Sequence, residues 1–517
     1  MSRDNHEFLD APNSYWIDST PQTDYPRLEE DINVDVAIVG GGIAGITSAF
    51  LLKKQGMKVA VIEANRILQG TTGHTTAKIT SQHSLIYAKL AKEMSEELAH
   101  QYAEANESAI HMIASLVEEH KIDCDFSWRP AYVYTQSEQN IKAIEEEARA
   151  ASNFGIKASC IETIPLPISI KAALQFDNQA QFHPLKYLKA LAQQIPGQGS
   201  SIYEHTAAVN IQDDPAAVVT RNGQKIIASK IILASHFPFF DGGGMYFSRI
   251  YSERSYITAV RIDDKFPEGY FINAESPVRS LRSQSDGDGE IVLLAGENHK
   301  TGDGQNLAVH YKNLLDFAHE TFEVRDVICR WSTQDCMTVD SVPYIGNLTS
   351  RSPHLYVATG FGKWGMSNGT ASAMILSDLI TKGDNPWAPV YNPSRFYLSS
   401  LKTFVIENAD VAKEYVAGKI AALPGNIDIS KGEARAVDLE GQRLGAFRDE
   451  MGELHLVDLT CTHLGCELKW NDAERSWDCP CHGSRFNFDG DILEGPAFNH
   501  LQPPGQCQNQ VEARIFE

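Results

Sequence analysis

The pattern of apolar and polar residues near the N-terminus predicts a strand, a helix and a second strand. Residues 34–39 form a short run rich in β-branched side chains, and residues 43–54 have the spacing of an amphipathic helix. Another apolar run, over residues 58–62, follows at once. This order predicts the start of an α/β domain with parallel strands.

The middle and the end of the chain carry other patterns. Alternating runs at 256–262 and 290–295 indicate strands that do not fit this α/β unit. A strand over 355–359 leads into another helix, and the proline-rich stretch 383–393 breaks that helix. A mostly helical segment follows, from 394 to about 422, and its apolar stripe is expected to lie against the preceding domain. The stripe comprises Leu401, Phe404, Val405, Val411, Tyr415, Val416 and Ile420.

A glycine-rich turn joins the first strand to the first helix. Its sequence, Gly40-Gly-Gly42-Ile43-Ala44-Gly45, lets the backbone approach a pyrophosphate, which then lies on the unpaired N–H groups of the helix N-terminus. Glu63, with Ala64 after it, ends the second strand about twenty residues on, where a carboxylate can bind a ribose hydroxyl. These residues predict a dinucleotide site, which the motif alone cannot assign to NAD or FAD.

A later segment favours FAD. Asp340-Ser-Val-Pro-Tyr-Ile-Gly346 precedes the strand at 355–359, which runs into Gly360-Phe-Gly362-Lys363-Trp364-Gly365-Met366 and a helix. This resembles the closing flavin-binding segment of the D-amino-acid-oxidase or glycine-oxidase-like family, and the resemblance covers about residues 33–385. It implies that the helix N-terminus points at the flavin pyrimidine edge, where the positive end of the helix dipole stabilises the reduced ring.

The stretch from Gly70 to Lys78 also bears on the flavin. Its small hydroxyl residues suit close contact with phosphate and isoalloxazine, so Thr71, Thr72 and Ala77 are candidate cofactor contacts, as is Ala208 at a later strand. His74 aligns with the histidine that carries flavin covalently in dimethylglycine-dehydrogenase-like enzymes. Either covalent attachment or an ordinary hydrogen-bonding role fits His74.

The C-terminal part contains four candidate metal ligands, Cys461, His463, Cys479 and His482, in two short loops. Two cysteines and two histidines suit a Rieske [2Fe–2S] centre, with the cysteines on the inner iron and the histidines on the outer one. A structural zinc site could use the same four groups, and geometry alone does not exclude it.

The rest of these loops favours the cluster. The loops resemble those of the Rieske proteins of the cytochrome bc family, over about the last ninety residues. The resemblance implies a disulfide between Cys466 and Cys481, and a covering proline loop at Gly495-Pro496-Ala497. High-potential members have a tyrosine two residues after Ser484, where this chain has Phe486. Because a sulfur hydrogen-bond donor is missing, we expect a potential below that of the bc-type proteins.

The expected domains follow from these assignments. An N-terminal extension (1–32) precedes an FAD-dependent oxidoreductase (33–393), a helical linker (394–425) and an all-β Rieske domain (426–517). Within the oxidoreductase, a Rossmann-like FAD-binding domain of the glutathione-reductase type is interleaved with an α+β substrate domain. The FAD-binding parts are about 33–127, 181–244 and 326–385, and the substrate parts are about 128–180 and 245–325.

The composition and charge of the chain limit the classes of partner that it could bind. The 517 residues are 43% hydrophobic, enough for large cores, and the net charge of −22 argues against nucleic acid and anionic membranes. The polar N-terminus resembles no targeting signal, and no apolar run reaches the length of a membrane span. We therefore expect a cytoplasmic protein, in which a disulfide would be unusual unless burial beside the cluster shields it.

The combination of flavin and Rieske cluster predicts the function. Flavin accepts two electrons as a hydride and the cluster carries one at a time, so we expect a dehydrogenase that oxidises a small amine or amino acid. Electrons would leave through an exposed edge at His463 and His482 to a one-electron acceptor, either a protein or a quinone. The architecture resembles that of YhfW-type flavoproteins.

The sequence is compatible with two other functions. Electrons could run in reverse, from a donor through the cluster and flavin to a substrate that is reduced, or the chain could be a redox sensor and interaction protein. A Rieske oxygenase is set aside, because no segment resembles a two-histidine, one-carboxylate iron site.

The candidate catalytic residues are few. Lys363 and Trp364 lie on the expected flavin-side loop, where the lysine charge could stabilise reduced flavin. Arg254 and Tyr256 could bind a substrate carboxylate, though a lone arginine and tyrosine on a strand are more often structural. The sequence indicates no catalytic base.

Overall fold

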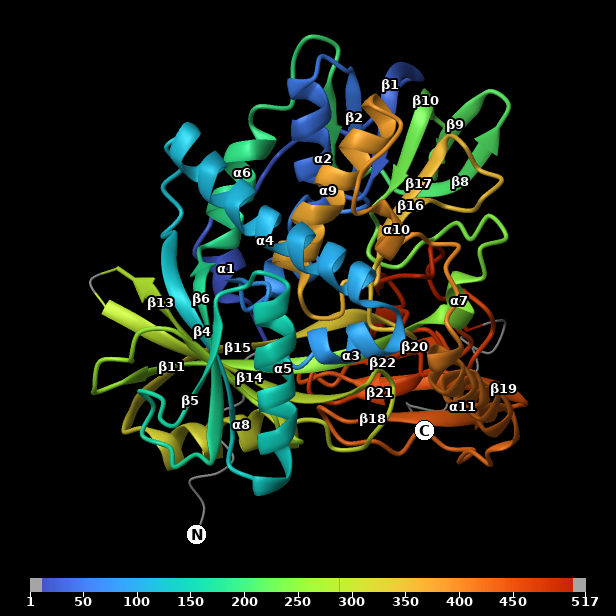
Figure 1. The fold of residues 1–517 in the computed structure, drawn as a ribbon. Coiled ribbons are helices and arrows are strands. Elements are labelled where there is room, and N and C mark those ends of the chain that lie inside the picture. The colour runs from blue at the N-terminus through green and yellow to red at the C-terminus, as the bar shows by residue number, and fades with distance from the viewer. Residues whose placement is uncertain (1–11, 288, 505–517) are drawn as a thin grey trace.

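The computed structural model describes residues 12–287 and 289–504, so expectations for residues 1–11 and 505–517 lie outside the described residues. An eight-stranded sheet forms the upper part of the molecule in Figure 1. Its centre is parallel: β1 (Ile32–Val39) pairs with β2 (Val59–Ile62) and with β10 (Lys225–Leu233), and β10 pairs with β17 (Leu355–Thr359). The outer strands are β7 (Ser201–Tyr203), β8 (Ala208–Asp213), β9 (Ala216–Thr220) and β16 (Tyr344–Asn347).

Helix α2 (Ile43–Lys54) confirms the predicted strand–helix–strand order at the start of this sheet. It is buried on nearly every side rather than along one stripe, because α9 (Gly365–Thr381) and α6 (Pro184–Ala192) both pack on it. The expected amphipathic pattern was therefore wrong, and the sequence of α2 reflects a helix enclosed between other elements. The long helix α4 (Glu96–Glu119) packs against α9 in turn.

A second sheet of nine strands lies below the first, in the order β15-β11-β14-β13-β12-β4-β6-β3 with β5 beside β6. The strand β15 (Val324–Thr338) pairs along its length with β11 (Ile250–Ile262). The segment expected to begin the last FAD-binding part near residue 326 therefore starts in the second sheet. The other strands are β3 (Lys78–Ile79), β4 (Ser127–Thr135), β5 (Ala158–Ile161), β6 (Ala172–Gln181), β12 (Tyr270–Asn273), β13 (Arg279–Asp286) and β14 (Gly289–Lys300).

Helices cover this sheet, and the described part of the N-terminal extension anchors a loop beside it. Helix α1 (Tyr15–Asp18) inserts Trp16, which is fully buried and donates from its indole nitrogen to the Thr75 carbonyl. Ser14 donates to the Gly73 carbonyl. The extension therefore holds the loop after Gly70 in place. The helices on the second sheet are α5 (Ile141–Asn153) and α8 (Val309–Thr321), and α3 (Tyr87–Glu93) packs on α4 and α5.

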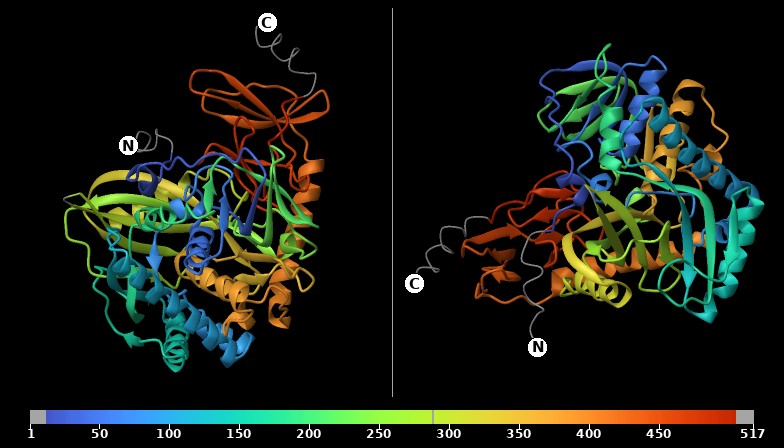
Figure 2. Two further views of the ribbon diagram at one scale, coloured as in Figure 1. Left: turned by 90° about the horizontal axis from the view of Figure 1, so that it is seen from above. Right: turned by 90° about the vertical axis from the view of Figure 1, so that its left-hand side faces the viewer.

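The C-terminal part folds into two small antiparallel sheets that pack against the second sheet (Figure 2). One sheet contains β18 (Ala434–Leu439), β19 (Gln442–Arg448) and β20 (Leu454–Asp458). The other contains β21 (Lys469–Asn471), β22 (Ser476–Asp478), β23 (Arg485–Asn487) and β24 (Ile492–Glu494). The two ligand loops connect the strands of these sheets.

The predicted linker helix is present as α11 (Leu401–Ile420), but its stripe does not lie against the oxidoreductase domain. No residue of α11 is buried, and Leu401, Val405, Val416 and Ile420 are exposed by 44–78%. The contacting face is polar instead: Asn408 donates to the Ser248 carbonyl, and Glu407 and Asp410 bind Lys300. Polar pairing with the oxidoreductase domain, together with Val411 packed on the core of the C-terminal domain, therefore orients this helix.

Across the described ranges, no helix has the length and apolarity needed to cross a membrane.

Candidate active site and cluster site

A cavity of about 990 Å³ lies between the two large sheets and the C-terminal domain. The glycine-rich turn, the loop after Gly70 and the loop before α9 all contribute to its wall. The sequence-predicted residues that line it are Gly40, Gly42, Ile43, Ala44, Glu63, Ala64, Thr71, Thr72, Ala208, Gly362, Lys363, Trp364, Gly365 and Met366. Segments some three hundred residues apart thus form one wall.

The glycine-rich turn has the geometry of a pyrophosphate cradle. Gly40 has φ of +113°, and a Cβ there would lie 2.3 Å from the Ala234 carbonyl oxygen. A Cβ on Gly45 would lie 1.9 Å from the Gly40 carbonyl oxygen. Glu63 accepts a 2.9 Å hydrogen bond from the Gly41 N–H. Because only glycine leaves this backbone bare and tightly wound, the cradle fits a dinucleotide.

Four predicted cofactor residues do not line the cavity but hold its wall. Gly45 and Gly360 allow close packing, since a Cβ on Gly360 would lie 2.3 Å from the Thr338 methyl group. The Ala77 carbonyl accepts from Arg282. His74 Nδ1 lies 2.9 Å from the Gly70 carbonyl oxygen, and Trp331 donates to the His74 carbonyl. The His74 side chain thus makes a hydrogen bond, and covalent attachment of the flavin to it stays a hypothesis.

The candidates Arg254 and Tyr256 point away from the cavity. Side chains alternate along β11, and Glu253, Ser255 and Ile257 are the ones that line it. Arg254 is buried and binds Glu494 of the C-terminal domain at 3.0 Å, while Tyr256 stacks on His299. The prediction of a substrate-binding role for this pair was wrong, because it chose the opposite face of the strand.

Lys363 belongs to a polar group whose other members, on the correct face, were missed from the sequence. Glu253 binds Lys363 Nζ at 2.7 Å and accepts from Asn298, and it lies directly across from Asp335 on β15. Burial raises the pKa of Asp335 to about 6, against the attraction of Lys363. These four residues all line the cavity. Since they come from four separate segments, no local motif marks them.

Lys78 is a second missed residue and supplies the basic group that the sequence did not. It lines the cavity and donates to the Ser280 hydroxyl. Burial, with a smaller contribution from Arg282, lowers the pKa of Lys78 to about 7. Lys78 is thus a cavity amine that is partly neutral near pH 7.

The predicted residue Trp364 lies on the loop before α9. Its ring stacks on that of the buried His83, with ring centroids 4.8 Å apart.

The four candidate cluster ligands form a cysteine pair and a histidine pair in the two ligand loops of the C-terminal domain. Cys461 and Cys479 are buried and share a hydrogen bond between their thiols, which lowers the pKa of Cys461. The rings of His463 and His482 lie 5.0 Å apart, and the Nδ1 atom of each is buried without a hydrogen-bond partner among the described residues. Burial lowers the pKa of His463 to about 4 and that of His482 to about 3, so both are neutral.

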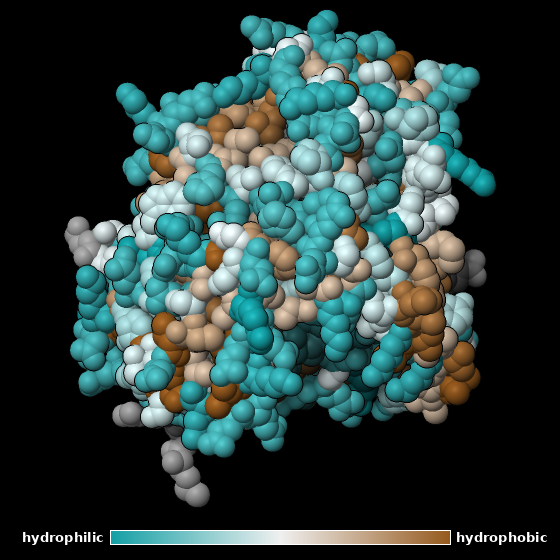
Figure 3. Space-filling model, viewed as in Figure 1, coloured by the Kyte–Doolittle hydropathy of each residue, from teal (hydrophilic) through white to brown (hydrophobic). Residues whose placement is uncertain are grey.

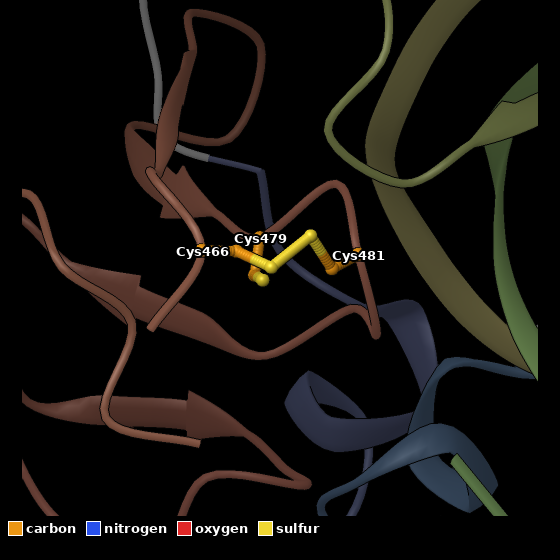
Figure 4. A group of neighbouring side chains, drawn as sticks. All are labelled: Cys466, Cys479 and Cys481. Atoms are coloured by element: carbon orange, nitrogen blue, oxygen red, sulfur yellow. A yellow bond between two sulfur atoms is a disulfide. The ribbon is translucent and has the colours of Figure 1, made fainter. Parts of the chain in front are cut away.

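This donor set fits a [2Fe–2S] cluster. A pair of thiols and a pair of imidazoles with unpartnered nitrogens are the donors that the mixed coordination of a Rieske centre requires. The expected disulfide between Cys466 and Cys481 is present, and Figure 4 shows Cys479 beside it. It ties the two ligand loops together.

The histidine edge faces the oxidoreductase domain rather than solvent. His482 is only 4% exposed, and its carbonyl accepts from Ser252 of β11. The ring of His463 lies 6.4 Å from that of Phe237, which itself lines the cavity. His482 is therefore not at the exposed edge that we expected, because domain docking covers it, whereas His463 is half-buried.

Docking also brings the proline loop to the cavity. Residues 492–498, which include Gly495-Pro496-Ala497, complete its wall. Glu494 is held between Arg254 and Arg485, and these arginines keep the pKa of Glu494 low despite its burial. The loop thus closes the cavity, and the Ala497 N–H donates to Ser484 Oγ beside the second ligand loop.

These features define a class: a flavin-dependent oxidoreductase with a Rieske domain packed onto its cofactor cavity. The chain belongs to the FAD dependent oxidoreductase family, whose model matches residues 35–379, and the Rieske [2Fe-2S] domain model matches residues 421–505. FAD and a [2Fe–2S] cluster are therefore its cofactors. The Rieske match excludes the structural zinc site that the same four ligands could have formed. The protein is an FAD-dependent oxidoreductase.

Relatives cover both parts of the chain. The Rieske 2Fe-2S iron-sulfur protein YhfW of Bacillus subtilis (strain 168) is 45% identical over 500 residues, which are 96% of this chain and 98% of that protein. The gamma-glutamylputrescine oxidoreductase of Escherichia coli (strain K12) is 27% identical over 220 residues, 41% of this chain and 51% of that protein. Glycine oxidase from Geobacillus kaustophilus has a TM-score of 0.60 at 19% identity, over 71% of this chain and 99% of that chain.

Phe486 allows a test of how the domain sets the potential. Its ring is fully buried in the core that also contains Cys461 and Cys479, while Ser484 hydrogen-bonds Cys461. We expect Phe486→Tyr to raise the midpoint potential by roughly 40 mV, which corresponds to a hydrogen bond stronger by about 1 kcal/mol in the reduced state. Potentiometric titration followed by EPR measures the shift, and Ser484→Ala should move the potential the other way. An unchanged potential in Phe486→Tyr contradicts the explanation.

Proposed function

We propose that this protein is a dehydrogenase that oxidises a small amine or amino acid and passes the electrons singly to an external acceptor. Bound FAD supplies hydride acceptance, and the Rieske cluster supplies one-electron transfer. The observation that carries the proposal is the single cavity wall shared by the glycine-rich turn, the flavin-side loop and the proline loop. A cluster domain docked on a flavin cavity gives electrons a route that needs no oxygen.

The proposed cofactor contacts follow from the geometry. The turn from Gly40 to Gly45 would hold the pyrophosphate, Glu63 the ribose, and the loop from Gly362 to Met366 the flavin ring. Cys461 and Cys479 would hold the inner iron, and His463 and His482 the outer iron. Phe237, between the cavity and His463, lies where electrons would cross from one site to the other.

The acceptor is proposed to meet the protein beside His482. The ring of Phe247 lies 6.1 Å from that of His482 and is 37% exposed, and Met245 and Leu464 are exposed by 53% and 49%. These three apolar side chains belong to the two segments that meet at the cluster. A one-electron partner, protein or quinone, would approach the cluster closely at this place.

Lys78 is proposed to accept the proton of the substrate ammonium before hydride transfer. Because burial lowers its pKa to about 7, Lys78 is protonated below that pH and neutral above it. The rate of flavin reduction by substrate should therefore rise with pH through about 7 and level off. Lys78→Met should lose this inflection and slow the step by roughly 10²- to 10⁴-fold. Lys78→Arg, which stays charged, should behave like Lys78→Met in stopped-flow measurements, and an inflection retained in either variant contradicts the role.

An anaerobic titration tests the whole proposal. Purified holoprotein is mixed with a panel of amines and amino acids, while flavin absorbance and the low-temperature EPR signal of the cluster are followed. We expect flavin bleaching and then a Rieske-type signal, and in Cys479→Ser the bleaching alone. If no compound bleaches the flavin while dithionite still reduces the cluster, the reverse flow of electrons or a sensing role is favoured instead.

A further inference from the structure

Helix α11 presents an apolar stripe that no described residue covers. Six of its residues, spaced by four, four, three, four and four positions, lie on one outward face. Figure 3 shows hydrophobic side chains gathered over this helix. Four of them, Leu401, Val405, Val416 and Ile420, are exposed by 44%, 56%, 56% and 78%. The two in the middle are Ala409 and Ala412, also exposed.

A contiguous exposed stripe of this kind is uncommon on a monomer and marks an interaction surface. The opposite face of α11 is already engaged, since Lys300 binds Glu407 and Asp410, and Lys469 binds Glu414. The helix is thus fixed on the molecule with its apolar side outward. Its spacing is that of a helix that packs against another helix.

The order of side chains along the stripe is symmetric about its centre. Read from either end it is large, medium, small, small, medium, large: Leu401, Val405, Ala409, Ala412, Val416, Ile420. In two antiparallel copies, Leu401 would face Ile420 of the second copy, and Val405 would face its Val416. The alanines would meet at the centre, where small side chains let two helices approach closely.

We infer that α11 is the interface of a two-fold symmetric dimer, in which the α11 helices of two copies pack antiparallel. An isologous interface requires a surface complementary to itself, and the symmetric stripe meets this requirement. Two 20-residue helices span about 30 Å of contact. Phe396 and Leu398, exposed by 65% and 81% just before α11, extend the apolar surface. The contact is modest against a standard interface of about 1,600 Å², so the dimer should dissociate on dilution.

A membrane surface is a poorer match for the stripe. Glu407, Asp410 and Glu414 face the rest of the protein, where Lys300 and Lys469 bind them, and the exposed charged residues beside the stripe include Lys402, Lys413 and Lys419. What opposes attachment to an anionic membrane is therefore the net charge of the whole chain, −22.

Sedimentation velocity of the full-length holoprotein over a range of concentrations tests the inference. The wild type should pass from monomer to dimer, and Val405→Lys/Val416→Lys should stay monomeric with its flavin and cluster spectra unchanged. Met451→Lys is the matched control, since Met451 is 82% exposed and lies in the turn between β19 and β20. It should dimerise like the wild type.

Cross-linking tests whether the two α11 helices pack antiparallel. Positions near the two-fold axis meet their own counterparts, so Ala412→Cys should be joined by a short bis-maleimide in a chain whose Cys160 and Cys507 are replaced by serine. Val405→Cys should not be joined. A wild type that is monomeric throughout, a double variant that still dimerises, or cross-linking of Val405→Cys alone would each overturn the inference. Binding of the monomer to vesicles of phosphatidylcholine and phosphatidylglycerol would assign the stripe to a membrane instead.

Discussion

Gly45→Ala is expected to weaken FAD binding by about 100-fold. The added methyl group would lie 1.9 Å from the Gly40 carbonyl oxygen, which is backbone and cannot rotate away. The helix must therefore move from the turn that forms the pyrophosphate cradle. Overpacking of this kind costs about 1–3 kcal/mol, and its upper end corresponds to roughly a hundredfold loss of affinity.

Flavin content after purification and titration of the apoprotein with FAD measure the effect. Gly56→Ala, just past the end of the same helix, is the control, because its φ of +87° adds backbone strain but a Cβ there meets nothing within 4 Å. It should keep its flavin, and both variants should keep the cluster EPR signal. Full flavin occupancy in Gly45→Ala would show that the turn does not hold the cofactor.

Gly483→Ala is expected to uncouple the cluster from the flavin. Gly483 has φ of +79°, and a Cβ there would lie 2.4 Å from Ser252 Oγ and 2.5 Å from Ser252 Cβ on β11. The Gly483 carbonyl also accepts from Gln334 at 2.8 Å. Because Ser252 cannot turn both atoms away, the ligand loop must lift off the oxidoreductase domain. The same range of overpacking costs predicts that substrate-driven cluster reduction slows by roughly 10- to 100-fold.

Flavin bleaching by substrate should keep its wild-type rate in this variant, and dithionite should still produce the Rieske signal. The matched control is Gly441→Ala in the same domain, where φ is +84° but the Cβ meets nothing within 4 Å. It carries the backbone strain without the clash, so its cluster reduction should stay near wild type. Equal slowing in both variants would mean that strain within the Rieske domain, and not docking, controls the transfer.

The sequence by itself determined what depends on local order. The strand–turn–helix at Gly40, the segment at Gly360 and the two ligand loops are each continuous, and their chemistry requires particular residues at fixed spacings. Both cofactors and the overall architecture could therefore be predicted. The Cys466–Cys481 disulfide could also be predicted, because a disulfide joins the ligand loops in the family that they resemble.

Tertiary structure alone decided which face of each element is used. A shift of one residue along a strand reverses the direction of its side chains, so Arg254 and Tyr256 were chosen where Glu253 and Ser255 line the cavity. Glu253, Asp335, Asn298 and Lys363 come together only through sheet pairing and loop packing. Docking of the C-terminal domain buries His482 and leaves the stripe of α11 outside. These outcomes depend on contacts between distant segments, which periodicity within one element cannot encode.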